Sequence, residues 1–299
     1  MKKNTFSGVL YSGQAVIIVL LIMVIALTVG ISISLRSSTN TRLSTRTEES
    51  QRAFSAAEAG LEAALIAGTG TLTNNTFGTN SKYEATNSFY GNELEFIFPE
   101  AIARDDTQQL WLVSHYANGD LYDVSGNLIT CNNGNAATTC YTIPTIYVCW
   151  GDSKYTNDEP AIEATLIYLQ GGVYKITKYA YDAKSRAGTN NGFVLASANN
   201  KCSKGSYYAT LTFPNTGGEQ YIALRLRLMY NVNKQAIVVK STDGISKFPY
   251  QGEMVVSTGK VYITGQNQAE VRTLHFYKSY PYLPGIFDFA LFSSNTLTK

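Results

Sequence analysis

The chain has 299 residues, a net charge of +2 at pH 7 and 15% charged residues, against a typical content of about 25%. Its few Lys and Arg residues are scattered, which excludes the basic surface of a nucleic-acid-binding protein. The 21 tyrosines, with abundant Thr, Ser, Asn and Gly between apolar runs, are typical of an exported, β-rich domain.

The first predicted element is an apolar helix. Residues 15–35 contain no charged side chain and follow a short polar leader that carries Lys2 and Lys3. At about 1.5 Å per residue, a helix of this length crosses the ~30 Å hydrocarbon core of a bilayer, so we expect one membrane-spanning segment here. Three small residues lie at four-residue spacing in this segment: Ala26, Gly30 and Ser34. They form a face suited to helix–helix packing; the alternative is that they are only the small residues common in any membrane helix.

A second helical stretch continues the first. Residues 47–67 are rich in Ala, Glu and Leu and contain no Pro, so the sequence predicts one long helix over 14–67, first apolar and then amphipathic. Residues 37–45 are poor helix formers, and Thr45 with Glu48 has the spacing of a capping box. We therefore expect the helix to bend or fray there.

The amphipathic half of the helix has one apolar face. Small residues on this face permit close approach to another backbone, and the large side chains expected to pack are Phe54, Leu61 and Leu65. The favoured partner is the globular part of the same chain. A homotypic coiled coil is the alternative, disfavoured because the face is short and rich in Ala and Ser.

The rest of the chain is predicted to be β. Residues 68–82 have the composition of a flexible polar linker, and residues 83–299 contain about ten short runs with strand alternation and no helical interlude. The sequence thus predicts an α+β protein, in which a long N-terminal transmembrane and stalk helix precedes an all-β, sandwich-like extracytoplasmic domain. A subdivision of that domain near 183–192 is also compatible with the pattern.

Two details of the β region are specific predictions. In YIALRLRLMY, alternate residues are expected to share one strand face: Ile222, Leu224, Leu226 and Leu228. The segments DLYDVSGNL and VVSTGKVYITG are predicted to be hairpins that turn at Ser-Gly and Thr-Gly.

Four cysteines lie in the predicted extracytoplasmic region: Cys131, Cys140, Cys149 and Cys202. Their even number favours disulfides in an oxidising compartment, and the absence of a CxxC pair argues against zinc. Three pairings are possible. We expect Cys131 to pair with Cys140, which closes a short polar loop, and Cys149 to pair with Cys202.

The sequence contains no recognisable catalytic pattern, and we expect no cofactor. His115 and His275 each lie among aromatic residues in a strand-like run, which is typical of structural histidines. Three acidic residues form a weak calcium candidate: Asp152, Asp158 and Glu159. They lack the spacing of an EF-hand, so a solvated loop is the favoured interpretation.

Aromatic residues stand out at the two tryptophans and in the C-terminal segment. Trp111 and Trp150 lie in apolar strands and are predicted to be core residues rather than glycan-binding ones. The C-terminal run 275–294 is the most aromatic segment of the chain. We expect residues 286–292 to fold back over the sandwich; the alternative is a strand offered to a neighbouring subunit.

The N-terminal fifth of the chain resembles a known family. Gly13 before the apolar segment, together with QRAFSAAEAGLE in the helix that follows, is similar to the N-terminal region of PilX-type minor pilins and K-type pseudopilins. The resemblance implies a class III prepilin. In such a protein the leader, residues 1–13, stays in the cytoplasm, a prepilin peptidase cuts between Gly13 and Gln14, and the mature helix packs into a filament.

Ile18 departs from the major pilins of this kind, which carry Glu at the corresponding fifth mature residue. That Glu would neutralise the N-terminal amine of the neighbouring subunit, and an unpaired charge inside an apolar helix bundle is costly. The departure favours a tip or initiating subunit over a repeating one.

The sequence therefore predicts a non-enzymatic subunit of a pilus or a secretion filament, anchored once in the cytoplasmic membrane. The resemblance implies three kinds of partner: other pilin or pseudopilin subunits, the prepilin peptidase and an inner-membrane assembly platform. A permanently anchored surface adhesin or glycan-binding protein is the alternative, distinguished by whether Gly13 is processed. A glycan-active enzyme would need a carboxylate pair across a cleft.

Overall fold

The computed structural model describes residues 12–116, 119–122, 125–128, 140–155, 157–184, 191–262 and 269–285. These residues contain one α-helix and fourteen β-strands in three sheets, which confirms the α+β prediction. The chain divides into two compact units. The helical unit comprises the described residues of Met1–Ala63 with Leu72–Ala85 and Ser257–Leu274, and the β unit comprises the other described residues.

Helix α1 (Ser12–Ala67) is continuous, so the bend predicted over 37–45 is wrong. Four threonine hydroxyls in this region each donate to the backbone carbonyl four residues earlier, over 2.9–3.0 Å: Thr39, Thr41, Thr45 and Thr47. Threonine weakens helices partly because its hydroxyl favours local bonds in non-helical turns. Here each hydroxyl is bonded inside the helix, and α1 runs through these residues despite their low helix propensity.

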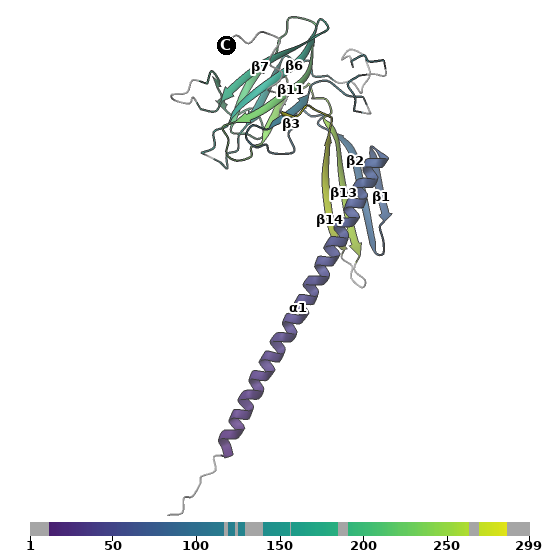
Figure 1. Cartoon of the computed structure of the whole chain (residues 1–299), viewed down its shortest axis with the longest axis vertical. Coiled ribbons are helices and arrows are strands. Elements are labelled where there is room, and N and C mark those ends of the chain that lie inside the picture. The colour runs from purple at the N-terminus through teal and green to yellow at the C-terminus, as the bar shows by residue number, and fades with distance from the viewer. Residues whose placement is uncertain are drawn as a thin grey trace, which may run out of the picture. The chain divides into compact units, whose positions relative to one another are not determined.

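A four-stranded sheet accompanies the helix, in the order β1-β2-β13-β14. Its strands are β1 (Gly70–Thr76), β2 (Ser81–Tyr90), β13 (Gly252–Tyr262) and β14 (Ala269–Ser279). In the helical unit, α1 lies along this sheet (Figure 1). The flexible linker predicted over 68–82 is wrong, because β1 and the first residues of β2 together occupy most of it. Strand β1 is a largely exposed edge strand, so it lacks the apolar alternation that would have revealed it.

The β unit contains two five-stranded sheets. The first has the order β3-β12-β5-β10-β9, formed by β3 (Glu95–Ile97), β12 (Ile237–Ser241), β5 (Thr145–Trp150), β10 (Tyr207–Thr212) and β9 (Ser197–Ala198). The second has the order β4-β11-β6-β7-β8, formed by β4 (Thr107–Trp111), β11 (Glu219–Met229), β6 (Ala161–Gln170), β7 (Val173–Asp182) and β8 (Val194–Leu195).

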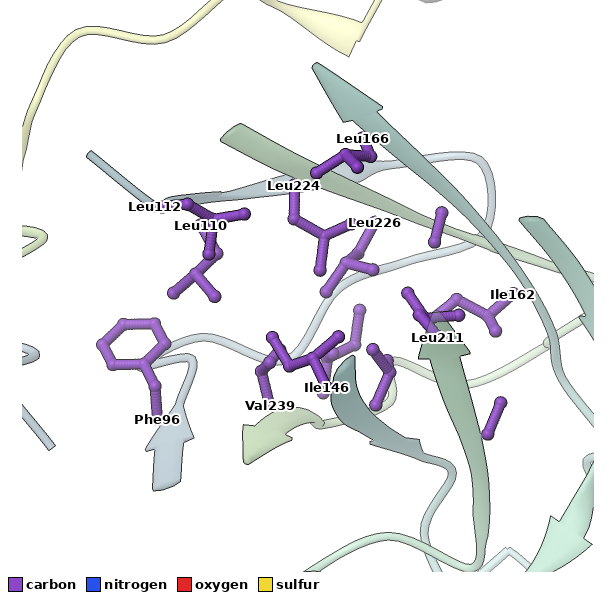
Figure 2. Close-up of a cluster of buried hydrophobic side chains, with 14 of the residues drawn as sticks. Phe96, Leu110, Leu112, Ile146, Ile162, Leu166, Leu211, Leu224, Leu226 and Val239 are labelled. Atoms are coloured by element: carbon purple, nitrogen blue, oxygen red, sulfur yellow. The ribbon is translucent and has the colours of Figure 1, made fainter. Parts of the chain in front are cut away.

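The main hydrophobic core of the β unit draws side chains from both five-stranded sheets, as a β-sandwich requires. Ile146 and Val239 come from the first sheet, and Leu166 and Leu224 come from the second (Figure 2). All four side chains are fully buried. The predicted sandwich-like arrangement is therefore present in this unit.

Strand β11 departs from simple alternation at Ile222. Its register against β6 shifts between Tyr221 and Ala223, which marks a β-bulge. Leu224 faces the main core, whereas Ile222 packs in a separate small cluster with Val113. The prediction that Ile222 shares a face with Leu224 is wrong, because the bulge inserts one residue and changes the facing of those before it.

Two further predictions need correction. The segment VVSTGKVYITG does not turn at Thr-Gly, since β13 runs through Gly259 to Tyr262; its last three residues lie outside the described part. The sandwich also does not subdivide near 183–192, because β7 and β8 lie on either side of that segment and pair in one sheet. The other predicted hairpin has an antiparallel bridge between Tyr122 and Leu128, on either side of its Ser-Gly.

Candidate functional site

The N-terminal half of α1 has no cover from the described part of the chain. From Val16 to Leu35 every side chain is exposed, including all the large apolar ones. This half is long and apolar enough to cross a membrane. The predicted cleavage position, between Gly13 and Gln14, lies in the first turn of the helix as the structure describes it.

The predicted packing residues of this half are all on exposed surface. Ile18 is 56% exposed, and a methyl group added at Gly30 would meet no atom within 4 Å. Ala26 and Ser34 are exposed as well. These residues make no tertiary contact within the described chain, so their surface is available to lipid or to another helix.

The C-terminal half of α1 is buried along a face made only of small residues: Ala53, Ala56, Ala57, Gly60 and Ala64. The predicted packing residues lie beside this face rather than on it. Leu61 and Leu65 are half-buried and Phe54 is 43% exposed. The buried face therefore differs from the predicted apolar face, which centred on Phe54, Leu61 and Leu65. The sheet approaches the helix too closely for large side chains to lie between them.

Two glycines mark this close approach within the helical unit. A Cβ at Gly259 of β13 would overlap the carbonyl oxygen of Ala53 and the amide nitrogen of Ala57. A Cβ at Gly60 would overlap the hydroxyl of Ser257 and lie 2.7 Å from the ring of Tyr83. Strand backbone therefore packs on helix backbone at Gly259, whereas at Gly60 the side chains of Ser257 and Tyr83 pack on the helix backbone. Neither glycine serves as a turn residue.

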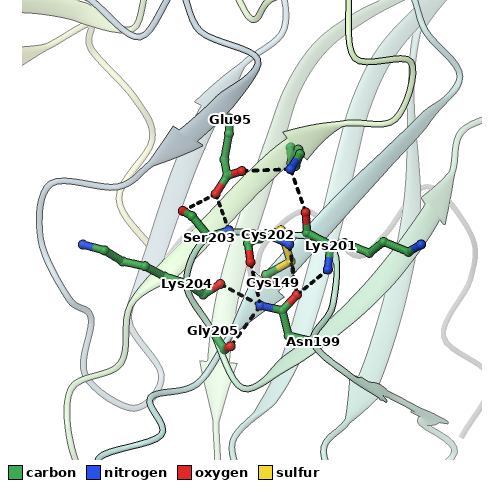
Figure 3. Close-up of a disulfide and its surroundings, with 9 residues drawn as sticks. Glu95, Cys149, Asn199, Lys201, Cys202, Ser203, Lys204 and Gly205 are labelled. Atoms are coloured by element: carbon green, nitrogen blue, oxygen red, sulfur yellow. Dashed lines mark hydrogen bonds and ion pairs between the residues drawn. A yellow bond between two sulfur atoms is a disulfide. The ribbon is translucent and has the colours of Figure 1, made fainter.

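Cys149 and Cys202 form a disulfide in the β unit, with Cα atoms 6.3 Å apart, as predicted (Figure 3). The bond joins β5 to the loop that precedes β10. None of the described cysteines is free. The other predicted bond, between Cys131 and Cys140, lies outside the described residues because Cys131 does.

Asn199 organises the loop that carries Cys202. Its side-chain oxygen accepts from the backbone N–H groups of Lys201 and Cys202 over 2.9 and 3.0 Å, and its amide donates to the carbonyl of Gly205 over 3.0 Å (Figure 3). Lys240 and the carboxylate of Glu95 form an ion pair of 3.2 Å beside the same loop. The disulfide is thus embedded in a fixed hydrogen-bonded loop.

The calcium candidates have other partners. Asp158 is buried, and its carboxylate accepts from the backbone N–H groups of Val232 and Asn233 and from the amide of Gln235, all over 2.8–2.9 Å. Burial raises the pKa of Asp158, but these hydrogen bonds outweigh burial and hold the pKa below its usual value. Asp158 therefore caps the loop between β11 and β12.

The other two acidic candidates are engaged elsewhere. Glu159 pairs with Lys184 over 3.1 Å, and Asp152 accepts the N–H of Lys154 over 2.9 Å in a local turn. No group of three potential ligands that could hold a metal ion is found in the described part of the chain.

A pocket of about 180 Å³ lies in the β unit, a feature that the sequence did not indicate. Aromatic side chains from several elements line it, among them Tyr90 at the end of β2 and Trp111 at the end of β4. Trp150 is fully buried, as predicted for a core residue, but Trp111 is only half-buried because it forms part of this wall. Tyr277 and Tyr282 also line the pocket, and each is close to half exposed.

Gln251 assembles the pocket. Its side chain bonds the backbone of Trp111 in both directions, accepting from N–H over 2.8 Å and donating to C=O over 2.9 Å. Its own backbone N–H donates to the carbonyl of Tyr90, and its carbonyl accepts from the N–H of Tyr280. One buried glutamine therefore fixes three parts of the pocket wall.

His115 lies behind this wall. Its ring stacks on Tyr280, with centroids 4.1 Å apart, and meets the edge of Trp111 at 4.6 Å. Burial lowers the pKa of His115 to about 4, and its Nδ1 atom has no hydrogen-bond partner among the described residues. A neutral imidazole packed between two rings is the structural role expected for this residue.

No protein family, curated protein or solved structure matches this chain.

Proposed function

We propose that this chain is a pilin-like structural subunit, a minor pilin or pseudopilin, that is cut after Gly13 and joins or caps a filament through α1. The observation that carries the proposal is the division of α1 into two halves. The helix has 56 residues, which corresponds to about 84 Å at 1.5 Å per residue. Only its C-terminal half packs on its own sheet, and the other half offers its whole surface to partners.

A plain membrane anchor has no need of this design. About 20 apolar residues span a bilayer, and a flexible linker then suffices to carry an outer domain. Here the helix continues unbroken past the membrane segment into the sheet, so the apolar half is coupled rigidly to folded structure. That coupling supports an assembly role over a permanently anchored adhesin.

The disulfide supports an extracytoplasmic location for the β unit, because such bonds persist in oxidising compartments. The charges that flank the membrane segment do not set this orientation by themselves. Lys2 and Lys3 precede the segment, whereas Arg36, Arg42 and Arg46 follow it closely. The orientation in this proposal therefore depends on the disulfide and on the leader.

Processing in the native host tests the proposal, with two glycines of the leader as matched positions. We expect mature wild-type protein to begin at Gln14, and Gly13→Leu to remain uncut because a bulky residue at the cleavage position blocks the peptidase. Gly8→Leu, which makes the same change away from the cleavage position, should be processed normally. Intact-mass measurement and N-terminal sequencing read the result. A mature chain that begins at Leu35, or an uncut wild type, would contradict the proposal.

A further inference from the structure

The pocket in the β unit combines flat aromatic walls with polar groups at their edges. Four tyrosines line the pocket: Tyr90, Tyr277, Tyr280 and Tyr282. Burial raises the pKa of Tyr90 to about 12, and the other three tyrosines add to the effect. Tyr90 and Tyr277 also meet ring to ring, with centroids 5.5 Å apart. Tyrosine presents an apolar ring and a polar tip, so this wall can bind a ligand that has both kinds of surface.

Five side chains with carboxylate, amide or aliphatic hydroxyl groups also line the pocket. Gln251 bonds the backbone of Trp111 and Gln109 bonds Arg225, and the remaining three are Glu100, Gln108 and Ser279. None of these three has a side-chain hydrogen bond to another of the described residues, so their donors and acceptors are available to a ligand. Among the described lining residues there is no cationic side chain, and Glu100 supplies a carboxylate. An anionic ligand would therefore meet repulsion without a compensating charge.

We propose that this pocket binds one neutral pyranose ring of a saccharide. A pyranose has faces of C–H groups, which pack on aromatic rings, and a rim of hydroxyl groups, which need the carboxylate, amide and hydroxyl partners found here. The volume of about 180 Å³ is below the ~300 Å³ of the smallest drug-sized pockets, which suits a single ring of a longer chain.

Two buried residues hold the pocket in shape before any ligand enters. Gln251 fixes the backbones of Tyr90, Trp111 and Tyr280 through the bonds described above. Arg225, which is 1% exposed, donates to the carbonyl oxygens of Leu283 and Pro284 and so holds the chain that carries Tyr282. A preorganised wall reduces the conformational entropy lost on binding.

The test uses full-length protein in a detergent without a sugar headgroup, because maltoside and glucoside detergents would compete for the pocket. The probes are immobilised oligosaccharides that end in neutral hexoses or N-acetylhexosamines, with sialic-acid-terminated versions of the same chains for comparison. We expect retention on neutral termini and at least about tenfold weaker retention on the sialylated ones. Binding should also change the fluorescence of Trp111, since the other tryptophan is buried in the core.

Exposed wall residues provide variants that fold. Tyr277→Ala and Tyr282→Ala should each weaken binding at least about tenfold by removing an aromatic wall. Tyr262→Ala is the matched control, because Tyr262 is equally exposed and does not line the pocket. Glu100→Gln, which keeps an acceptor and removes the charge, should retain neutral saccharides and reduce the discrimination against sialylated ones. Absence of binding to every neutral terminus, or wild-type binding by Tyr282→Ala, would overturn the proposal.

Discussion

The guanidinium group of Arg225 donates a hydrogen bond of 2.7 Å to the carbonyl oxygen of Leu283, fastening the segment after β14 onto the middle of β11. The same guanidinium donates to the side chain of Gln109 over 2.8 Å. Arg225 follows Leu224 in β11, so its side chain points to the other face of the strand, away from the core. It is nevertheless as buried as a core residue. A cation buried this deeply requires hydrogen-bond partners, and backbone carbonyls supply them.

Arg225→Met should lower the stability of the β unit. The substitution leaves the carbonyl of Leu283 without its donor, and an unsatisfied buried acceptor costs about 1–3 kcal/mol. Urea unfolding followed by tryptophan fluorescence measures the change, because both tryptophans lie in this unit. Arg104→Met is the control: its ion pair with Asp105 is exposed, so a change below about 0.5 kcal/mol is expected. Equal effects of the two variants would contradict the role assigned to Arg225.

Gly259→Ala should disrupt the packing of α1 on its sheet. The added methyl would overlap helix backbone, which cannot change rotamer to make room, so we expect a loss of about 1–3 kcal/mol or more. Gly30→Ala adds the same methyl to the exposed half of the helix, where nothing lies within 4 Å, and should leave stability unchanged or raised by up to about 1 kcal/mol. Hydrogen exchange of residues 53–64 distinguishes the two variants. Unaltered protection in Gly259→Ala would refute the close approach.

His115 should make stability depend on pH. A histidine in the unfolded chain titrates near ~6.5, whereas burial lowers the pKa of folded His115 to about 4. Between these values the unfolded chain binds a proton that the folded chain does not, so stability falls as the pH is lowered from 6.5 toward 4. His115→Phe, which keeps a ring against Tyr280, should flatten this slope relative to wild type. His275→Phe, at an exposed position, serves as the control. Parallel slopes for wild type and His115→Phe would rule the effect out.

Ile18 should limit incorporation into filaments if the proposed function holds. We expect wild-type protein to be scarce relative to the major subunit in sheared filaments, and Ile18→Glu to increase its share by supplying the carboxylate that pairs with a neighbouring amine. Ile22→Glu introduces the same charge one turn later, where no amine meets it, and should decrease incorporation. Quantitative mass spectrometry of the filaments measures both. Wild-type protein as the dominant component would exclude a tip or initiating role.

The sequence predicts those elements whose signal is local. The apolar run that starts α1 and the alternation in β6, β7 and β10 depend only on neighbouring residues, and these elements were found close to their predicted places. Strand β1 was missed because an edge strand needs little apolar alternation. The single long helix was predicted, but the bend expected over 37–45 is wrong, because low helix propensity in one short stretch did not interrupt α1.

The remaining differences come from contacts between residues far apart in the sequence. The pattern predicts a turn at Gly259, but in the structure this glycine lets a helix some two hundred residues earlier in the sequence approach the strand closely. The pocket depends on Gln251 bonding the backbone of Trp111, and an isolated glutamine in sequence carries no sign of such a partner. The Cys149–Cys202 pairing was predictable because few cysteines leave few alternatives.

The glycine contact between α1 and β13 also has a mechanical consequence. A force applied along the N-terminal half of the helix reaches the sheet where the backbone near Ala53 and Ala57 lies against Gly259. The nearest atoms across the contact at Gly259 are backbone atoms, which cannot change rotamer to absorb a displacement. A pull along the helix axis therefore acts as shear between α1 and β13. Because the two backbones are in direct contact, the pull on the N-terminal half is transmitted to the sheet with little relative movement.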